Sequence, residues 1–289
     1  MGGENKLNLW DAPIMPELPE VETIANGLDK RVSGDRIESV WVGLKPEPLK
    51  STAAAIARTL EGAYVKSVRR VGKHIVFDLR GNSLHGNGTS EKSQWIVHLG
   101  MTGRMLVTDP RTEIPKHTHL VARLASGKEL RFVDPRRFGR LEVRKGDFAG
   151  HGAEPLAISG KDFLELFHPR SAPIKALLLN QSLLQGVGNI YADESLFRAG
   201  IRPRRRADSL TRAELRALRK ALRAVLREAI AAGGSSVSDY VDAEGEEGFF
   251  QLRHRVYGRE GQPCRVCKKK IKKIIVAGRG THYCPGCQK

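Results

Sequence analysis

The sequence has no apolar run of about 18 residues, the length that a membrane-spanning helix requires. Residues 1–14 also lack the continuous apolar core of a secretory signal. Acidic residues are scarce: 32 Asp and Glu stand against 49 Lys and Arg, a formal net charge of +17. These absences predict a cytoplasmic protein without a membrane anchor and with a polyanionic partner. Nucleic acid is the favoured polyanion, because the basic residues are spread over loops and a cysteine-containing end rather than along one amphipathic helix.

Cysteine occurs only four times, in two Cys-x-x-Cys pairs separated by sixteen residues. This spacing is typical of a four-thiolate zinc site, since each pair supplies two ligands from one tight turn. Disulfides are the alternative, which a cytosolic compartment disfavours. With four ligands in four positions, one Zn²⁺ would be structural and would leave no open position for catalysis. The expected ligands are Cys264, Cys267, Cys284 and Cys287.

Short segments rich in β-branched residues predict a two-sheet or barrel-like unit in the first half of the chain. The expected strands are 37–42, 64–68, 74–79, 95–99, 120–124 and 130–133, with helices at 20–28 and 51–60 and an exposed hairpin loop at 81–93. Strand patterns cease after Val143, and helical patterns run from Gly160 to about Ala232. The last of these, over 210–232, places arginines on its outer face.

The tripeptide Met15-Pro16-Glu17 has a specific chemical possibility. If translation begins at Met15 and that methionine is removed, Pro16 becomes the N-terminus and presents a free secondary amine. Such an amine condenses with an aldehyde-level carbon to give an iminium ion, and its pKa leaves part of it neutral near pH 7 to 8. Glu17 adds a carboxyl within reach of the same carbon. The simpler alternative is that proline opens a helix.

Several glycine-rich turns carry polar or apolar side chains that suit a nucleic-acid interface. Gly186-Val187-Gly188 before Asn189 can bring backbone N–H groups close to a phosphate at a helix N-terminus. Arg279 stands between two glycines at the expected hairpin tip between the cysteine pairs. Met101 and Phe138 lie on turns, where each could wedge between bases, although most Met and Phe are core residues.

These segments together resemble the formamidopyrimidine-DNA glycosylases, bacterial enzymes that excise oxidised purines. The resemblance runs from Met15 to Lys289 through separate motifs in family order. It implies that Pro16 is the nucleophile and Glu17 an acid–base residue. It also implies catalytic phosphate contacts by Lys73 and Arg279. The further DNA contacts that it implies are His117, Lys175, Asn189, Met101, Arg136 and Phe138, with Arg136 facing the widowed cytosine.

The resemblance implies an α+β fold: an N-terminal β-sandwich with flanking helices, a helix–two-turns–helix domain, and a C-terminal zinc-finger hairpin. The expected boundaries are 1–14 for an extension outside the active protein, 15–148 for the sandwich, 149–159 for a linker, 160–258 for the helical domain with a lesion-capping segment, and 259–289 for the finger. The implied partner is double-stranded DNA with oxidised bases, bound by a monomer associated with the bacterial nucleoid.

Three alternatives stay open. An endonuclease VIII-type enzyme would prefer oxidised pyrimidines, whereas Leu-Pro-Glu-Val-Glu-Thr after Glu17 and the full segment 236–251 favour the purine branch. A non-catalytic DNA-binding protein would result if Pro16 were never N-terminal, because an amide nitrogen is not nucleophilic. A zinc-finger transcription regulator would explain the charge and the cysteines but not residues 15–23.

Overall fold

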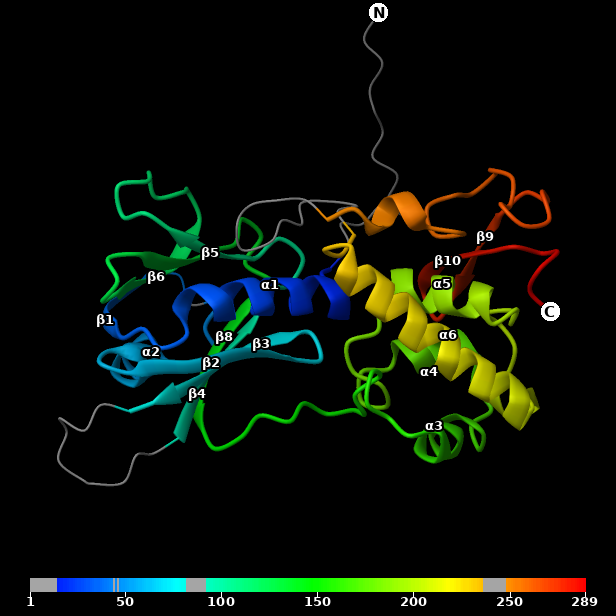
Figure 1. Ribbon diagram of the computed structural model, residues 1–289, viewed down its shortest axis with the longest axis horizontal. Coiled ribbons are helices and arrows are strands. Elements are labelled where there is room, and N and C mark those ends of the chain that lie inside the picture. Colours follow the sequence, from blue (N-terminus) through cyan, green and yellow to red (C-terminus); the bar gives the residue numbers. More distant parts are fainter. Residues whose placement is uncertain (1–14, 44, 46, 82–91, 236–247) are drawn as a thin grey trace, which may run out of the picture.

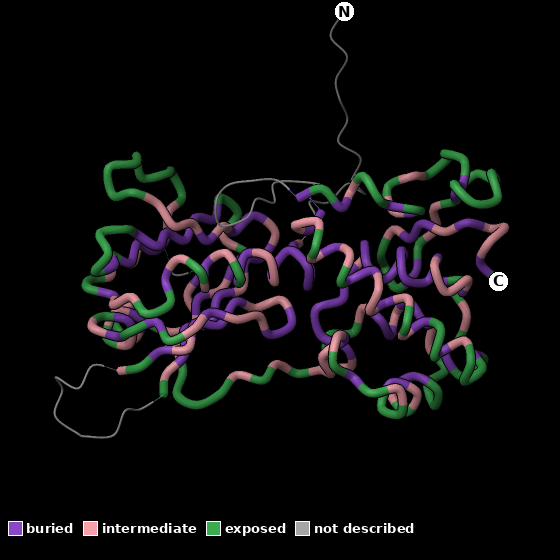
Figure 2. The backbone as a smooth tube through the Cα atoms, in the orientation of Figure 1, coloured by how far each residue is buried: buried purple, intermediate pink, exposed green. Residues whose placement is uncertain are grey.

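The computed structural model describes residues 15–43, 45, 47–81, 92–235 and 248–289. Figure 1 shows two lobes, one built mainly of strands and the other mainly of helices. Helix α1 (Leu18–Val32) crosses the strand lobe, and its N-terminal end reaches the helical lobe. None of the helices in these ranges has the length and apolar character needed to cross a membrane. Figure 2 shows that buried residues follow α1 and the interior of both lobes, while exposed residues concentrate in the connections.

Helix α1 begins earlier and ends later than the predicted 20–28. Proline is tolerated in a first helical turn because its missing N–H has no intrahelical acceptor there. Glu17 and Glu20 also form a capping box that satisfies two backbone donors at this end. Leu18 belongs to the apolar core of the helical lobe, whereas Ile24 and Leu28 belong to that of the strand lobe. The helix therefore connects the two cores.

The strand lobe is a two-layer β-sandwich, as expected. One antiparallel sheet has the order β1 (Ile37–Val42), β6 (Thr118–Leu124), β7 (Glu129–Val133) and β5 (Arg104–Thr108). The other has the order β2 (Tyr64–Val71), β3 (His74–Arg80), β4 (Lys92–His98) and β8 (Arg140–Lys145). Residues of both sheets, of α1 and of α2 (Ala53–Leu60) form one apolar cluster, in which the rings of Phe77 and Trp95 stack 4.6 Å apart.

Two strands, β5 and β8, were not predicted from the sequence. Both are edge strands of their sheets and only part of each is buried. In β5, Met105, Leu106 and Val107 form a run without alternation, whereas β8 does alternate polar and apolar residues and could have been predicted. The predicted loop at 81–93 connects β3 to β4, which pair as antiparallel neighbours with Arg80 opposite Lys92. Residues 82–91 of that loop lie outside the described residues.

The helical lobe contains α3 (Gly160–Phe167), α4 (Ile174–Leu179), α5 (Asn189–Arg198) and α6 (Arg212–Ala231), with short 3₁₀ helices at Ala207–Ser209 and Phe250–Arg253. Strands β9 (Lys272–Val276) and β10 (Arg279–Tyr283) form the C-terminal hairpin. Its two turn residues, Ala277 and Gly278, both have positive φ, the backbone geometry of a tight type I′ hairpin turn.

An ion-pair cluster joins the strand lobe to the connection between the lobes. The side chain of Arg70 is 6% exposed and contacts Glu22 at 2.5 Å and both carboxylate oxygens of Glu154 at 3.0 and 2.9 Å. Glu154 lies between β8 and α3. Removing a carboxylate would leave the buried Arg70 guanidinium less compensated, so this contact fixes β2 and α1 to the connection that follows β8.

Candidate active site

The side chain of Glu17 is buried at the N-terminus of α5, 171 residues further along the chain. Its Oε2 accepts hydrogen bonds from the backbone N–H of Gly188 at 2.8 Å and of Tyr191 at 3.4 Å, and its Oε1 accepts one from Ile190 at 2.9 Å. Burial raises the pKa of Glu17 to about 7, although Lys73 and these N–H groups oppose the shift. Near neutral pH, Glu17 is therefore able both to donate and to accept a proton.

Glycine is required beside Glu17 for reasons of space. A Cβ at Gly188 would lie 2.3 Å from Glu17 Cδ, and one at Gly186 would lie 3.0 Å from Leu18. Gly186 also has φ +87°, which favours glycine, whereas Gly188 is extended with φ −129°. The predicted positive φ therefore holds only for Gly186. The absence of a Cβ at Gly188 leaves room for the Glu17 carboxylate beside the backbone of the turn.

We expect Gly188→Ala to lower the rate of base excision at least tenfold and to destabilise the fold by about 1 to 3 kcal/mol, the usual cost of overpacking a filled site. The new methyl group must displace either Glu17 or the first turn of α5. Thermal unfolding and single-turnover excision measure the two effects. Gly160→Ala is the matched control, because a Cβ there meets nothing within 4 Å. Equal behaviour of the two variants would contradict the close approach.

Glu20 connects the start of α1 to two other segments. Its carboxylate accepts from the Tyr191 hydroxyl, from the Ser235 N–H at 2.8 Å and from the Glu17 N–H at 2.9 Å. Burial raises the pKa of Glu20. Ser235 in turn bonds His254 through its hydroxyl at 2.9 Å. The backbone of Glu17 is thus held from the α1 side by Glu20, while its carboxylate is held from the α5 side.

Lys73 and Arg279 come from different elements but share the electrostatic environment of Glu17. Lys73 lies in the turn between β2 and β3, and Arg279 begins β10 and is exposed. Burial lowers the pKa of Lys73, with Arg279 acting in the same direction and Glu17 and Glu20 opposing it. The structure therefore brings the predicted Glu17, Lys73 and Arg279 together, next to Pro16, from three separate parts of the chain.

The buried carboxylate of Asp134 holds together the turns that carry the predicted wedges. It accepts from Thr102 Oγ1 at 2.6 Å and from the Gly139 N–H at 2.7 Å, and a Cβ at Gly100 would lie 2.6 Å from the Phe138 carbonyl carbon. The turn of Met101 thus touches the turn of Phe138. Met101 is half-buried and Phe138 is exposed, and neither belongs to an apolar core cluster.

Arg136 and His117 lie at the same place. The Arg136 guanidinium lies over the Phe138 ring, with its Cζ 4.9 Å from the ring centroid. Arg136 itself is exposed. His117 has positive φ, is exposed, and accepts a backbone hydrogen bond from the Asp134 N–H at 3.0 Å. Four of the predicted DNA contacts, Met101, His117, Arg136 and Phe138, therefore surround one buried aspartate.

Lys175 requires a correction. Its side chain is 0% exposed, and its ammonium lies 2.7 Å from Asp193, 2.7 Å from Thr281 Oγ1 and 3.3 Å from the Gly280 carbonyl. Two hydrogen bonds and a buried ion pair hold the ammonium inside the protein, so it does not face a phosphate at the surface. Asp193 also accepts from the His282 N–H at 2.7 Å. Lys175 and Asp193 instead attach β10 to the helical lobe.

Asn189 is half-buried at the first position of α5. Its Nδ2 donates to the Gly280 carbonyl at 2.9 Å, next to Arg279, and its Oδ1 has no hydrogen-bond partner among the described residues. The Asn189 side chain thus lies at the junction of the glycine turn and the hairpin. Its predicted phosphate contact stays a prediction.

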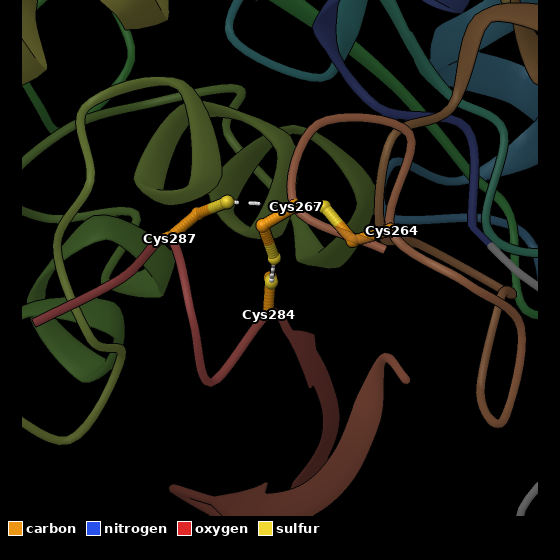
Figure 3. A group of neighbouring side chains, drawn as sticks. All are labelled: Cys264, Cys267, Cys284 and Cys287. Atoms are coloured by element: carbon orange, nitrogen blue, oxygen red, sulfur yellow. Dashed lines mark hydrogen bonds between the residues drawn. The ribbon is translucent and has the colours of Figure 1, made fainter. Parts of the chain in front are cut away.

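The four cysteines converge at the base of the hairpin, as Figure 3 shows. Their Sγ atoms all lie within 4.8 Å of one another, with 3.8 Å between Cys264 and Cys287 and 3.3 Å between Cys267 and Cys284. Four sulfurs at the usual Zn–S distance of about 2.3 Å from one ion would stand about 3.8 Å apart in a tetrahedron. The geometry fits one structural Zn²⁺, held by two knuckles that flank β9 and β10.

We expect removal of zinc by a chelator to weaken lesion-DNA binding at least tenfold, because the two knuckles hold the hairpin that carries Arg279. Zinc content and DNA affinity, measured on the same sample, provide the test. Re-addition of zinc should restore affinity, which separates loss of the metal from irreversible unfolding. Unchanged affinity in zinc-free protein would contradict this role.

Residues 236–251 were expected to cover an extruded base, and residues 236–247 lie outside the described residues. Sequence reasoning also missed several buried residues that hold the site: Glu20, Asp134, Tyr191, Asp193 and the pair Arg70–Glu154. The capping-box spacing of Glu17 and Glu20 was a local signal that could have identified Glu20. The other residues act through contacts between segments distant in the sequence.

Comparison with known proteins gives a consistent assignment along the chain. Residues 15–141 match the formamidopyrimidine-DNA glycosylase N-terminal domain, residues 152–241 the H2TH domain of the same enzymes, and residues 261–289 the zinc finger found in FPG and IleRS. A formamidopyrimidine-DNA glycosylase of Gluconobacter oxydans is 44% identical over 95% of this chain and 100% of its own length. One of Thermus thermophilus is 45% identical over 95% and 98%.

The fold agrees with these matches. The crystal structure of a Lactococcus lactis FPG mutant bound to Fapy-dG-containing DNA is 33% identical, has a TM-score of 0.85, and covers 95% of this chain and 100% of that one. The Lactococcus lactis enzyme bound to DNA with an abasic site has the same TM-score over 94% and 99%. The N-terminal-domain, H2TH and zinc-finger matches follow one another along the chain, and together they include Glu17, Lys73 and Arg279. This chain therefore belongs to the formamidopyrimidine-DNA glycosylase family.

Proposed function

We propose that this protein excises oxidised purines, 8-oxoguanine and formamidopyrimidines, from double-stranded DNA and then cleaves the abasic strand. The observation that carries the proposal is the environment of the Glu17 carboxyl. A carboxyl with a pKa of about 7 lies against the N-terminus of α5, next to Pro16 and within the electrostatic range of Lys73. The relatives named as formamidopyrimidine-DNA glycosylases support the same activity.

The reaction begins with extrusion of the damaged nucleotide, because C1′ is inaccessible while the base is stacked. Met101 and Phe138 fill the gap and Arg136 bonds the widowed cytosine. The neutral amine of Pro16 then forms a bond to C1′ as the C1′–base bond breaks, and the departing base takes up the proton that the Pro16 nitrogen loses. Glu17 donates its proton to the sugar ring oxygen, which opens the ring and leaves an iminium ion. Proton removal at C2′ and then C4′ releases the two phosphates by β- and δ-elimination.

Lys73, Asn189 and Arg279 hold phosphates beside the lesion, and His117 contacts DNA near the wedges. These side chains position the backbone without reading sequence. Zn²⁺, held by the four cysteines, fixes the hairpin of Arg279 and takes no part in the chemistry. The protein would act as a monomer in the cytoplasm, at the bacterial nucleoid.

Residues 15–289 form the active enzyme in this proposal, with domains at 15–148, 160–258 and 259–289. The family match begins at Met15, and relatives matched over 100% of their own length cover 95% of this chain. Residues 1–14 would lie outside the enzyme, and initiation at Met15 with removal of that methionine would expose the Pro16 amine.

An endonuclease VIII-type preference for oxidised pyrimidines is the second candidate. A solved Lactococcus lactis Fpg complex contains DNA with an oxidised pyrimidine, at 34% identity and a TM-score of 0.84. Activity on one pyrimidine lesion would therefore not by itself separate the branches. The relative rates on the two lesion classes do so.

The test uses protein that begins with Pro16 and three duplexes: 8-oxoguanine opposite cytosine, 5-hydroxycytosine opposite guanine, and undamaged DNA. We expect single-turnover excision of 8-oxoguanine at least tenfold faster than of 5-hydroxycytosine, with no strand cleavage of undamaged DNA. The reverse order would assign the pyrimidine branch. Tight binding of the lesion duplex without excision would assign a non-catalytic lesion-binding protein.

A further inference from the structure

Helix α6 carries a basic stripe that the proposed reaction does not use. The stripe consists of Arg212, Arg216, Arg219, Lys220, Arg223 and Arg227. At 3.6 residues per turn these six positions fall within an arc of about 100° on one side of the helix. The buried positions of α6, such as Leu215, Leu222 and Val225, occupy another side. The stripe is the outer face of arginines that the sequence predicts for the helix over 210–232.

The two carboxylates of α6 do not neutralise this stripe. Glu214 pairs with Arg205 at 2.5 Å, and Glu228 pairs with Arg198 at 2.6 Å, so each is bound to an arginine from outside the helix. On the neighbouring α3, Glu165 pairs with Lys161 and Asp162 bonds Ser159. Among the described residues, no carboxylate is paired with a member of the stripe; Arg219 bonds the Ile158 carbonyl.

The stripe is unfavourable for the helix itself. Like charges three or four residues apart, such as Arg212 with Arg216 and Arg223 with Arg227, repel each other. Arg212 in the first turn also opposes the helix dipole. Partial burial together with Arg219 and Arg227 lowers the pKa of Arg223, whose Nε has no acceptor among the described residues. An anion along the stripe would relieve each of these effects.

The stripe lies on a different side of the helical lobe from the candidate active site. Helix α5 packs against α6 on one side and against β10, which carries Arg279, on the other. In Figure 1, α6 is in front, α5 is in the middle and the β9–β10 hairpin is more distant.

We propose that the basic stripe of α6 is a second, non-catalytic binding surface for double-stranded DNA. A 20-residue helix spans about 30 Å. Along that length each DNA strand presents about nine phosphates, one for every 3.4 Å of duplex axis. Five arginines and one lysine along one face suit this regular row of anions and read no sequence. The stripe would hold a second segment of duplex while the cleft holds the first. This inference rests on the proposed function in that DNA is taken as the partner.

The experiment first fills the cleft with an unlabelled duplex that carries a tetrahydrofuran abasic analogue. It then measures binding of a fluorescent undamaged duplex to that complex by anisotropy, over a series of salt concentrations. The stripe variant combines Arg216→Gln, Lys220→Gln, Arg223→Gln and Arg227→Gln, and glutamine preserves helix propensity. The control combines Lys30→Gln, Arg58→Gln, Lys66→Gln and Lys128→Gln, four exposed residues of the strand lobe. Both variants lose the same charge.

We expect the loaded wild-type complex and the control to bind the second duplex, and the stripe variant to bind it at least tenfold more weakly. The slope of log affinity against log salt should fall by about 3 to 4 in the stripe variant. Single-turnover excision should be unchanged in both variants. A double variant, Arg216→Gln with Lys220→Gln, should show an intermediate loss and guards against a folding defect.

Three results would overturn the inference: no second duplex on the loaded wild type, equal losses in stripe and control variants, or binding of polyglutamate in place of duplex. The last would assign the stripe to an acidic protein. Failure to load the tetrahydrofuran duplex would overturn the proposed function instead. In that case the stripe is tested by comparing how tightly the stripe and control variants bind the undamaged duplex alone.

Discussion

Protein in which residues 1–15 precede Pro16 is expected to form no covalent adduct with 8-oxoguanine DNA under borohydride, whereas protein that begins with Pro16 is expected to be trapped. The nitrogen of an internal proline is an amide without a nucleophilic lone pair, so the loss should be complete rather than partial. A free proline amine is partly neutral near pH 7 to 8 and attacks C1′ directly. Gel analysis of the trapped complex, followed by peptide mapping, measures both the yield and the residue attached.

The control for this prediction is one polypeptide examined before and after cleavage. A protease site placed just ahead of Pro16 leaves the extended form inactive, and cleavage should restore the adduct in the same sample. An adduct formed by the uncleaved protein would contradict the amine mechanism. Peptide mapping would then be expected to find the sugar on a lysine, and Lys73 is the first candidate because burial lowers its pKa.

Glu17→Gln is expected to reduce the rate of 8-oxoguanine excision by about 10² to 10⁴-fold, the usual contribution of a positioned general acid. Glutamine has the size of glutamate but has no proton to give to the ring oxygen. It also turns an NH₂ group toward the N–H groups of Gly188 or Ile190, which replaces an acceptor with a donor. Cleavage of a preformed abasic site is the matched reaction, because its sugar already opens to the aldehyde. That rate should fall much less, and equal losses on both substrates would contradict the acid role.

The pH dependence follows from the same carboxyl. Because the pKa of Glu17 is raised to about 7, the protonated acid is the main form below that pH. Loss of the Glu17 proton should lower wild-type excision on the alkaline side, while deprotonation of the Pro16 amine raises it over about pH 7 to 8, so the wild-type profile should be bell-shaped. The residual rate of Glu17→Gln should keep the rise and lack the fall. The raised pKa also means that the contribution of Glu17 to folding stability is fully present below pH 4.5 and is lost as the pH rises toward 7. A Glu17→Gln profile with the same alkaline fall as the wild type would contradict the proton donation.

The spacing of residues along the sequence was enough to predict the zinc site and most strands of the sandwich. Two Cys-x-x-Cys pairs predicted the zinc site, since each pair closes one short turn, and the four sulfurs do converge. Alternating β-branched segments predicted six strands of the sandwich but not β5, whose apolar residues are consecutive, nor β8, although β8 alternates. Pro16 and Glu17 could be predicted to act as a pair because residues adjacent in the chain lie close together in any fold.

The partners of these residues were decided by tertiary structure alone. Nothing near Glu17 in the chain indicates that its carboxylate faces Gly188, or that Gly188 must lack a side chain for that reason. Lys175 showed the limit most clearly: its sequence pattern suited a solvated or phosphate-binding lysine, but packing buries it against Asp193. The stripe of α6 can be read from the sequence, yet only the fold pairs Glu214 and Glu228 with other arginines and leaves the stripe uncompensated. Periodicity and spacing record local geometry, whereas burial and charge pairing depend on which distant segments meet.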